Sequence, residues 1–359
     1  MMAAMETSAH HGRGRLFAER RAAICCDVLD AWFDPSSHAV EAFGTTGLDM
    51  RTSPEADGRP LVEAIAEARN IDPDCINIGA GSSEIMYRVL PRLYGEGPVV
   101  ILDPSYSEYT YLLRRDGRQI KPFQLNEQSR FRPSVSALID ACQDASLVIL
   151  VNPNNPTGQA LLKPEILRLK EAMPKQAALW IDEAYVDYGG PVCSVETEAC
   201  QIEGLFVLKS LSKAYALSGV RAAYFVSRPE AAREIAKTTP PWIVGTSAQA
   251  AAAAAVRDSE YYTAKWLESA FILAEFSTHL RSLGLTVYSG QINAALVETP
   301  PHTTATCWAH DLADAGLIVR TPVGMGEVLG ERYIRIGLVE RRLWPRILQI
   351  IASCMERGL

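Results

Sequence analysis

A lysine and an arginine frame one short polar stretch of the chain. Lys213 comes close behind two serines, Ser210 and Ser212, and Arg221 follows eight positions later. The apolar run at residues 204–208 predicts a buried strand that leads into this stretch. A lysine amine can form a Schiff base with an aldehyde cofactor, whereas hydroxyl and guanidinium groups bind phosphate. We therefore hypothesise that Lys213 is a catalytic amine and that the serines and Arg221 hold the cofactor's phosphate, although a plain basic loop would show the same pattern.

Three side chains in two other loops are suited to a pyridine ring. Asp182 ends the apolar run at residues 178–181, and a carboxylate beside a ring nitrogen keeps that nitrogen protonated. Tyr185 and Asn155 could bind the phenolic oxygen of the same ring. Each has an ordinary interpretation as well: a strand-end cap for Asp182, a half-buried aromatic for Tyr185 and a tight turn for Asn155.

A Gly/Ser turn at residues 79–84 adds a second candidate for phosphate binding. Ser82 and Ser83 open a predicted helix, and the free N–H groups of a helix start bind phosphate. The turn is neither a Walker A loop nor a dinucleotide fingerprint, because the lysine and the third glycine of those motifs are missing. Alone it is a weak signal, since many such turns are only helix caps.

Two further residues complete the candidate set. Tyr109 would stack on the ring as an aromatic lid, although ordinary helix packing explains it nearly as well. Arg335 lies in an Ile-Arg-Ile strand and would hold a substrate anion, although an arginine on an alternating strand is more often a surface residue.

Composition and charge exclude several classes of protein. The chain has 359 residues, enough for two domains, and 48% of them are hydrophobic, which favours a packed core. A net charge of −7 argues against a nucleic-acid binder and against a protein of anionic membranes. The eight cysteines form no CxxC pair, so we expect no metal site and a reducing compartment. No apolar run approaches the roughly 20 residues that span a bilayer, and residues 1–15 lack the core of a signal peptide, so we expect a cytoplasmic protein without a membrane segment.

Short apolar runs alternate with helical patterns between residues 75 and 226. Strands are predicted at residues 76–78, 99–102, 121–125, 147–151, 178–181, 204–208 and 222–226, and helices at 61–70, 85–93, 106–115, 138–142 and 164–173. Such alternation is typical of an α/β domain with a mostly parallel sheet flanked by helices. Ligands bind beyond the carboxyl ends of such strands, so the polar clusters that follow the strands should meet at one rim.

The rhythm changes after residue 255 and indicates a smaller α+β domain. A long helix is predicted at residues 259–283, and a helix at 16–33 is expected to pack with this part, whereas residues 38–60 read as irregular. We therefore predict a large domain at residues 52–255. The small domain would combine residues 1–51, as an N-terminal arm, with residues 256–359.

Together these stretches resemble fold-type I pyridoxal-phosphate enzymes of the class I/II aminotransferase family, and most of all its histidinol-phosphate aminotransferase branch. The series Asn-Asn-Pro-Thr-Gly, Asp-Glu-Ala-Tyr and Ser-x-Ser-Lys carries the resemblance between about residues 76 and 340. It implies the Schiff-base lysine at Lys213 and a substrate carboxylate or phosphate at Arg335. It also implies pyridoxal 5'-phosphate, a homodimer, and cofactor-binding roles for Ser82, Ser83, Tyr109, Asn155, Asp182, Tyr185, Ser210, Ser212 and Arg221.

Three departures from the family pattern concern the rim of the site. The segment at residues 50–55 lacks the tyrosine that usually reaches the partner subunit's phosphate site. The usual Arg-Thr pair is Lys209-Ser210 here, and Ser218 stands where the pattern Leu-Ala-Gly-Leu-Arg has alanine. The N-terminal segment around Trp32, which in the family shapes the substrate pocket, is also altered, and we assign Trp32 to substrate binding.

The resemblance implies an aminotransferase that acts on an amino acid or related amine in biosynthesis, with a keto acid as acceptor. The same scaffold can also decarboxylate, eliminate or replace a β- or γ-group, or cyclise an amino acid, so a specialised biosynthetic enzyme of this kind is the alternative. A cofactor-free regulator is disfavoured, because Lys213, Asp182 and Arg221 are all present.

Overall fold

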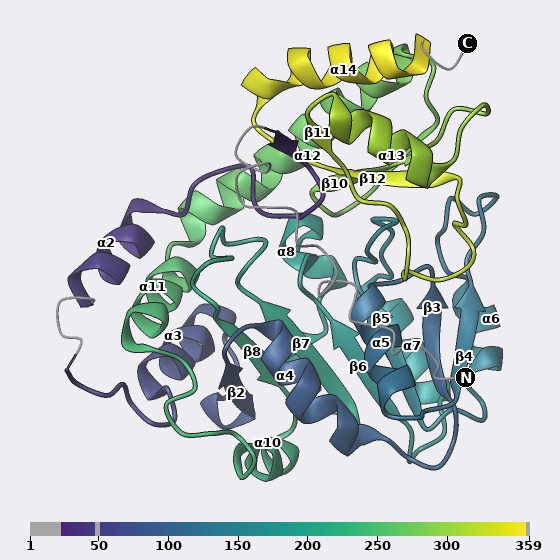
Figure 1. Ribbon diagram of the computed structural model, residues 1–359. Helices are drawn as coiled ribbons and strands as arrows, with labels where there is room; N and C mark the ends of the chain where they lie inside the picture. The colour runs from purple at the N-terminus through teal and green to yellow at the C-terminus, as the bar shows by residue number, and fades with distance from the viewer. Residues whose placement is uncertain (1–22, 47–50, 357–359) are drawn as a thin grey trace, which may run out of the picture.

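The computed structural model describes residues 23–46 and 51–356 (Figure 1). Its centre is a seven-stranded sheet in the order β2-β8-β7-β6-β5-β3-β4. Strand β8 is antiparallel to both of its neighbours, and every other neighbouring pair is parallel. The predicted α/β fold with a mostly parallel sheet is therefore confirmed. The strands are β2 Ile76–Gly79, β3 Val99–Asp103, β4 Ile120–Gln124, β5 Leu147–Val151, β6 Ala178–Asp182, β7 Leu205–Ser210 and β8 Ala223–Val226.

Helices cover both faces of this sheet, which explains why strands β3, β5, β6 and β7 are buried along their whole length. One face packs against α4 Ser82–Val89, α5 Ser107–Arg115 and α10 Pro229–Ala236. The other face packs against α3 Arg59–Arg69, α6 Val135–Ala141, α7 Lys163–Ala172 and α11 Thr246–Arg257. The short helices α8 Val186–Gly189 and α9 Glu196–Ala199 follow β6.

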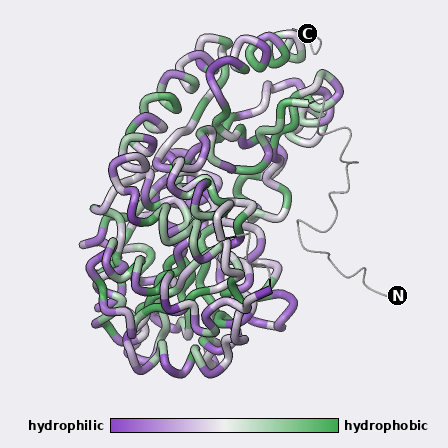
Figure 2. The backbone as a smooth tube through the Cα atoms, turned by 90° about the vertical axis from the view of Figure 1, so that its left-hand side faces the viewer, coloured by the Kyte–Doolittle hydropathy of each residue, from purple (hydrophilic) through white to green (hydrophobic). Residues whose placement is uncertain are grey.

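A second, smaller core lies above the sheet in Figure 1. Its antiparallel sheet has the order β12-β10-β9, with β9 Val287–Ser289, β10 Ala294–Glu298 and β12 Tyr333–Gly337. Helices α13 Ala305–Asp314 and α14 Trp344–Glu356 pack on it. The long helix α12 Ser259–Ser282 runs from α11 up to this core, and Figure 2 shows the two parts stacked along the length of the molecule.

The N-terminal segment differs from the prediction. The described part of the predicted helix at residues 16–33 holds only the short strand β1 Ile24–Cys25, which pairs with β11 Leu317–Ile318, followed by irregular chain with bends at residues 27–28 and 32–33; residues 16–22 lie outside the described residues. The apolar side chains of this segment pack into different clusters, Cys26 into the small core and Phe33 into the large one. In a helix these two residues would lie two turns apart on one face, so tertiary packing overrides the local pattern.

Residues 38–60 were predicted to be irregular, but α2 Ser37–Thr46 forms there. This helix packs against α11, which in turn packs against α3, and so it lies with the large sheet. The predicted domain limits stay a prediction. No helix in the described ranges is long and apolar enough to cross a membrane.

Candidate active site

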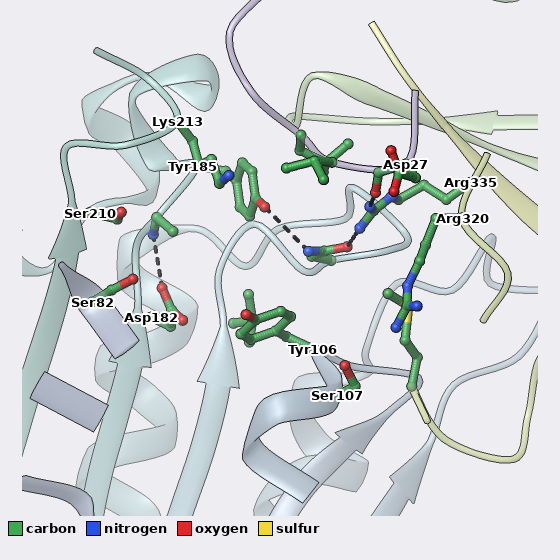
Figure 3. Close-up of a pocket in the computed structure, with 16 residues that line it drawn as sticks. Asp27, Ser82, Tyr106, Ser107, Asp182, Tyr185, Ser210, Lys213, Arg320 and Arg335 are labelled. Carbon is green, nitrogen blue, oxygen red and sulfur yellow. Dashed lines mark hydrogen bonds between the residues drawn. The ribbon is translucent and has the colours of Figure 1, made fainter. Parts of the chain in front are cut away.

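A cavity of about 250 Å³ lies where β5, β6 and β7 end, between the large sheet and the smaller core (Figure 3). Strands that run parallel bring their carboxyl ends to one rim, which gathers residues far apart in the chain. Seven predicted site residues line this cavity together: Ser82, Asn155, Asp182, Tyr185, Ser210, Lys213 and Arg335.

Asp182 lies at the end of β6 with only 4% of its surface exposed. Its Oδ2 accepts a hydrogen bond from the Tyr109 hydroxyl at 2.7 Å, and its Oδ1 accepts one from the Ala184 N–H at 3.0 Å. Burial raises the pKa of Asp182 to about 6 in spite of these donors. In the described part of the chain no basic side chain forms an ion pair with it. A protonated ring nitrogen would supply the missing cation.

Tyr109, predicted to stack on the ring, does not line the cavity. Its side chain is fully buried, and its hydroxyl accepts from Trp180 Nε1 at 2.8 Å while it donates to Asp182. It therefore supports Asp182 from the side away from the cavity. Tyr106, just before the first turn of α5, lines the cavity instead. We assign the stacking role to Tyr106, because helix α5 turns Tyr109 into the interior.

Asn155, Tyr185 and Arg335 form one chain of hydrogen bonds (Figure 3). Asn155 Nδ2 donates to the Tyr185 hydroxyl at 3.3 Å, and Arg335 Nη1 donates to Asn155 Oδ1 at 2.7 Å. Arg335 Nη2 donates to the Asp27 carbonyl at 2.6 Å. The group that would bind a ring oxygen is thus connected to the arginine that would bind a substrate anion.

Ser82 and Arg221 meet at the start of α4. A Cβ at position 81 would lie 2.3 Å from Arg221 Nη2, so only glycine, here with φ of +87°, lets the guanidinium approach the helix start. Arg221 Nη1 donates to Ser212 Oγ at 3.2 Å. The free N–H groups of the first turn, the hydroxyls and the guanidinium together suit a phosphate. Ser83, Ser212 and Arg221 do not line the cavity itself.

Lys213 brings its amine to the cavity with 22% of its side chain exposed. Its backbone carbonyl accepts a hydrogen bond from the Tyr188 hydroxyl at 3.0 Å. Its Nζ donates to Asp30 Oδ1 at 3.0 Å, a contact that the sequence did not predict.

Trp32, predicted to bind substrate, does not line the cavity. Its ring meets Phe33 edge-on and its Nε1 donates to Ser269 Oγ at 2.7 Å. It therefore ties the N-terminal segment to α12. The segment contributes residues 27–29 to the cavity wall instead.

Sequence reasoning missed Arg320, which is 5% exposed and lines the cavity beside Arg335. The two residues exchange backbone hydrogen bonds across an isolated antiparallel bridge. Arg320 ends an apolar run at residues 316–319, just as Asp182 ends the run at residues 178–181. The same sequence pattern could therefore have identified it.

A cluster of buried charged residues lies directly behind the loops that follow β6 and β7. Lys209 Nζ lies 3.2 Å from Glu183, 3.6 Å from Glu196 and 3.9 Å from Asp187, and Arg69 lies 2.9 Å from Asp187. Burial alone would lower the pKa of Lys209, but the three carboxylates raise it. Glu183 follows Asp182, and Lys209 precedes Ser210, so the cluster fixes the ends of β6 and β7.

These features fit pyridoxal phosphate: a buried carboxylate that lacks a cation, a cradle for an anion around Gly81 and Arg221, and a lysine that lines the same cavity as the carboxylate. In residues 23–46 and 51–356 no group of His, Cys, Asp and Glu is placed to hold a metal ion.

Comparisons with known proteins agree with this geometry. The chain is 29% identical over 354 residues to the histidinol-phosphate aminotransferase of Paracoccus denitrificans (strain Pd 1222), covering 98% of this chain and 94% of that protein. It is 31% identical over 331 residues to the histidinol-phosphate aminotransferase of Erythrobacter litoralis (strain HTCC2594), covering 89% and 88%.

Solved structures are similar in fold. Histidinol-phosphate aminotransferase from Sinorhizobium meliloti in complex with pyridoxal-5'-phosphate has a TM-score of 0.85 at 21% identity, covering 95% of this chain and 94% of that chain. L-threonine-O-3-phosphate decarboxylase from Porphyromonas gingivalis has a TM-score of 0.77 at 21% identity, covering 93% and 99%. The predicted pyridoxal-phosphate fold type I is thereby confirmed. A model of the aminotransferase class I and II family matches residues 48–351, and the chain belongs to this family.

Proposed function

We propose that this pyridoxal-phosphate-dependent aminotransferase takes its amino group from a donor that carries a phosphate or a carboxylate. The observation behind the proposal is the pair Arg320 and Arg335, each 5% exposed and both lining the cavity of Lys213. Arg320 Nη2 donates to the Val323 carbonyl at 3.3 Å, and in the described part of the chain it forms no ion pair. A buried guanidinium is costly without an anion, so a substrate anion completes the site.

The residues of the cavity then divide the work. When bound, pyridoxal phosphate supplies the electron sink that stabilises a carbanion at the amino-bearing carbon of the substrate. Asp182 keeps the ring nitrogen protonated, and the Asn155 and Tyr185 side chains hold the phenolic oxygen. Lys213 Nζ binds the cofactor and acts as the base that moves the substrate proton. Ser82, Ser210, Ser212 and Arg221 hold the phosphate, with Ser83 contributing through its backbone N–H.

The relatives named above support a phosphorylated amine as the donor class, since histidinol-phosphate aminotransferases recur among them. Two guanidinium groups on the wall of one cavity suit a phosphate, which accepts several hydrogen bonds at once. A keto acid is proposed as the acceptor that completes the cycle. Decarboxylation is the second candidate, because the decarboxylase from Porphyromonas gingivalis has the same fold. It is only the second, because that likeness is one of fold alone.

The test compares donors that differ in their anion. Purified protein is mixed with L-histidinol phosphate, L-glutamate or L-histidinol, and the pyridoxamine phosphate formed in one turnover is measured. We expect transfer from at least one anionic donor and at least 100-fold slower transfer from histidinol. Arg320→Met should lower kcat/KM for the anionic donor by about 100-fold, on the order of 3 kcal/mol, and leave histidinol unaffected.

Two results would contradict the proposal. Equal rates with histidinol and the anionic donors would remove the role of the arginines. Release of carbon dioxide without pyridoxamine phosphate would favour the decarboxylase.

We also propose a cytoplasmic homodimer. Support comes from large apolar side chains that are exposed on the isolated chain, among them Val40 and Phe43 one turn apart on α2, 56% and 47% exposed. All eight cysteines are free, as a reducing compartment requires. Sedimentation velocity should give the mass of two chains at micromolar concentration. A single-chain mass at every concentration would disprove the dimer.

A further inference from the structure

The N-terminal segment at residues 26–36 contributes residues 27–29 to the cavity wall, and its first half is fixed from the smaller core. The Gly337 N–H donates to the Cys26 carbonyl at 2.8 Å. Asn293 Nδ2, itself a buried side chain, donates to the Asp30 carbonyl at 2.9 Å. With Arg335 on the Asp27 carbonyl, these contacts hold the backbone of Asp30 in one place.

The side chain of Asp30 reaches across to the large sheet. Its Oδ1 accepts from Lys213 Nζ at 3.0 Å and from Ser218 Oγ at 2.5 Å. Ser218 Oγ also lies 3.0 Å from the Ser212 carbonyl, and the Ser218 carbonyl accepts from Arg221 Nη1 at 3.1 Å. The hydroxyl that orients Asp30 thus belongs to the loop that holds the phosphate-binding groups.

Ser218 is one of the positions at which this chain departs from the family pattern, where alanine stands. Alanine has no hydroxyl and could not donate to Asp30. The pair Asp30 and Ser218 is therefore a feature of this chain that the general reaction of the family does not require.

We propose that Asp30 is a positioning residue that binds the Lys213 amine when the amine is protonated and not bonded to the cofactor, and that Ser218 fixes the carboxylate for this contact. The inference rests on the proposed role of Lys213. An ammonium group beside a carboxylate is stabilised as the cation. Asp30 therefore holds the free lysine at the edge of the cavity, where it leaves room for the second substrate.

Other charged and titratable groups surround this contact and set the background for any pH effect. They come from β6, from the chain after β6, from the loop before β8 and from the smaller core: Asp182, Tyr185, Tyr188, Arg221, Arg335 and Glu340. Burial, first of all, raises the pKa of both tyrosines, and Asp30 adds to the rise. Since these groups stay in place when Asp30 is changed, a difference between matched variants reports Asp30 alone.

The experiment uses the cofactor-free protein and an amine-reactive acetylating reagent, with Lys213 acetylation followed by mass spectrometry between pH 6 and 10. The amine reacts only when the carboxylate does not hold it, so the rate of acetylation at each pH reports the contact. Asp30→Asn should make the reaction about threefold faster at a fixed pH, as expected for a partly exposed ion pair. The difference in rate should shrink in 1 M salt.

Two matched variants accompany it. Asp34→Asn makes the same chemical change at an exposed residue of the same segment and should leave the profile unchanged. Ser218→Ala restores the family residue and should give part of the rate increase of Asp30→Asn without altering the charge. Because Ser218→Ala is a small change at a partly buried position, it keeps the test decisive should Asp30→Asn fail to fold.

Profiles of Asp30→Asn and Ser218→Ala that coincide with that of the unchanged protein would overturn the inference. The proposed function is tested separately in the same assay, because added pyridoxal phosphate should protect Lys213 from acetylation. Loss of that protection would remove the lysine assignment, whereas unchanged profiles with intact protection would remove only the role of Asp30.

Discussion

The carboxyl group of Asp182 is buried, and burial disfavours its charged form. In the cofactor-free protein the charged form therefore lowers the stability of the fold. Tyr109 and the Ala184 N–H each donate to it, yet its pKa is raised from 3.8 to about 6. The folded chain therefore holds this proton more tightly than the unfolded chain. The contribution of Asp182 to stability is full below about pH 4 and is lost as the pH rises through about 6.

Asp182→Asn should remove this pH dependence. In urea denaturation of the cofactor-free protein, the free energy of unfolding of the variant, relative to that of the unchanged protein, should rise by about 3 kcal/mol between pH 4 and pH 7. This value corresponds to roughly two pH units at about 1.4 kcal/mol each. Asp140→Asn, at an exposed acid on α6, is the control. Parallel stability curves for Asp182→Asn and the unchanged protein would show that the carboxyl titrates normally.

Residue types identified most of the site, but they did not give side-chain direction. Asp182, Asn155 and Lys213 follow strands directly, so a parallel sheet was enough to bring them together. By residue type and spacing, Tyr106 and Tyr109 are both suited to stack on the ring. Only the start of α5 at Ser107 decides that Tyr106 faces the cavity.

At the scale of elements, the ends of β6 and β7 are joined by more than their backbone ladder. Glu183 and Lys209 are 0% and 2% exposed and form an ion pair directly beside Asp182 and Ser210. A buried charge that has lost its partner lowers the stability far more than the intact pair raises it. Removing only one side of this contact therefore has a large effect.

Lys209→Met should lower the free energy of unfolding by about 3 to 5 kcal/mol, because it leaves buried carboxylates without a cation. Lys237→Met is the matched control, since Lys237 pairs with Glu234 at the surface and should cost no more than about 1 kcal/mol. Urea midpoints of the cofactor-free variants give both values. Equal losses would show that the cluster behaves as a surface pair.

The strands and helices of the sheet followed from local pattern, whereas the N-terminal elements did not. Apolar runs with turn residues between them predict each strand and helix from residues that lie within a few positions of one another. Helix α2 and the irregular chain at residues 26–36 depend on surfaces that come from far along the sequence, namely α11 and the smaller core. No pattern within the segment itself records those surfaces.

At the scale of the whole molecule, the cavity is closed by contacts between the two cores. Asp103, at the end of β3, accepts the N–H groups of Glu327 and Val328 from the loop before β12. A Cβ at Gly326 would lie 2.0 Å from its carboxylate, which requires glycine there. This loop also carries Met325 to the cavity wall, so the larger core positions part of the substrate side.

The N-terminal segment at residues 26–36 is made long before the residues that hold it. Arg335 and Asp27 are 308 positions apart, so Asp27 leaves the ribosome well before its binding partner is synthesised. At roughly 5 to 20 residues per second, Asp27 waits tens of seconds for this partner. The groups that hold the cofactor, residues 82–221, are all present before Arg320 and Arg335 exist. A nascent chain can therefore acquire its cofactor-binding loops well before it can recognise a substrate.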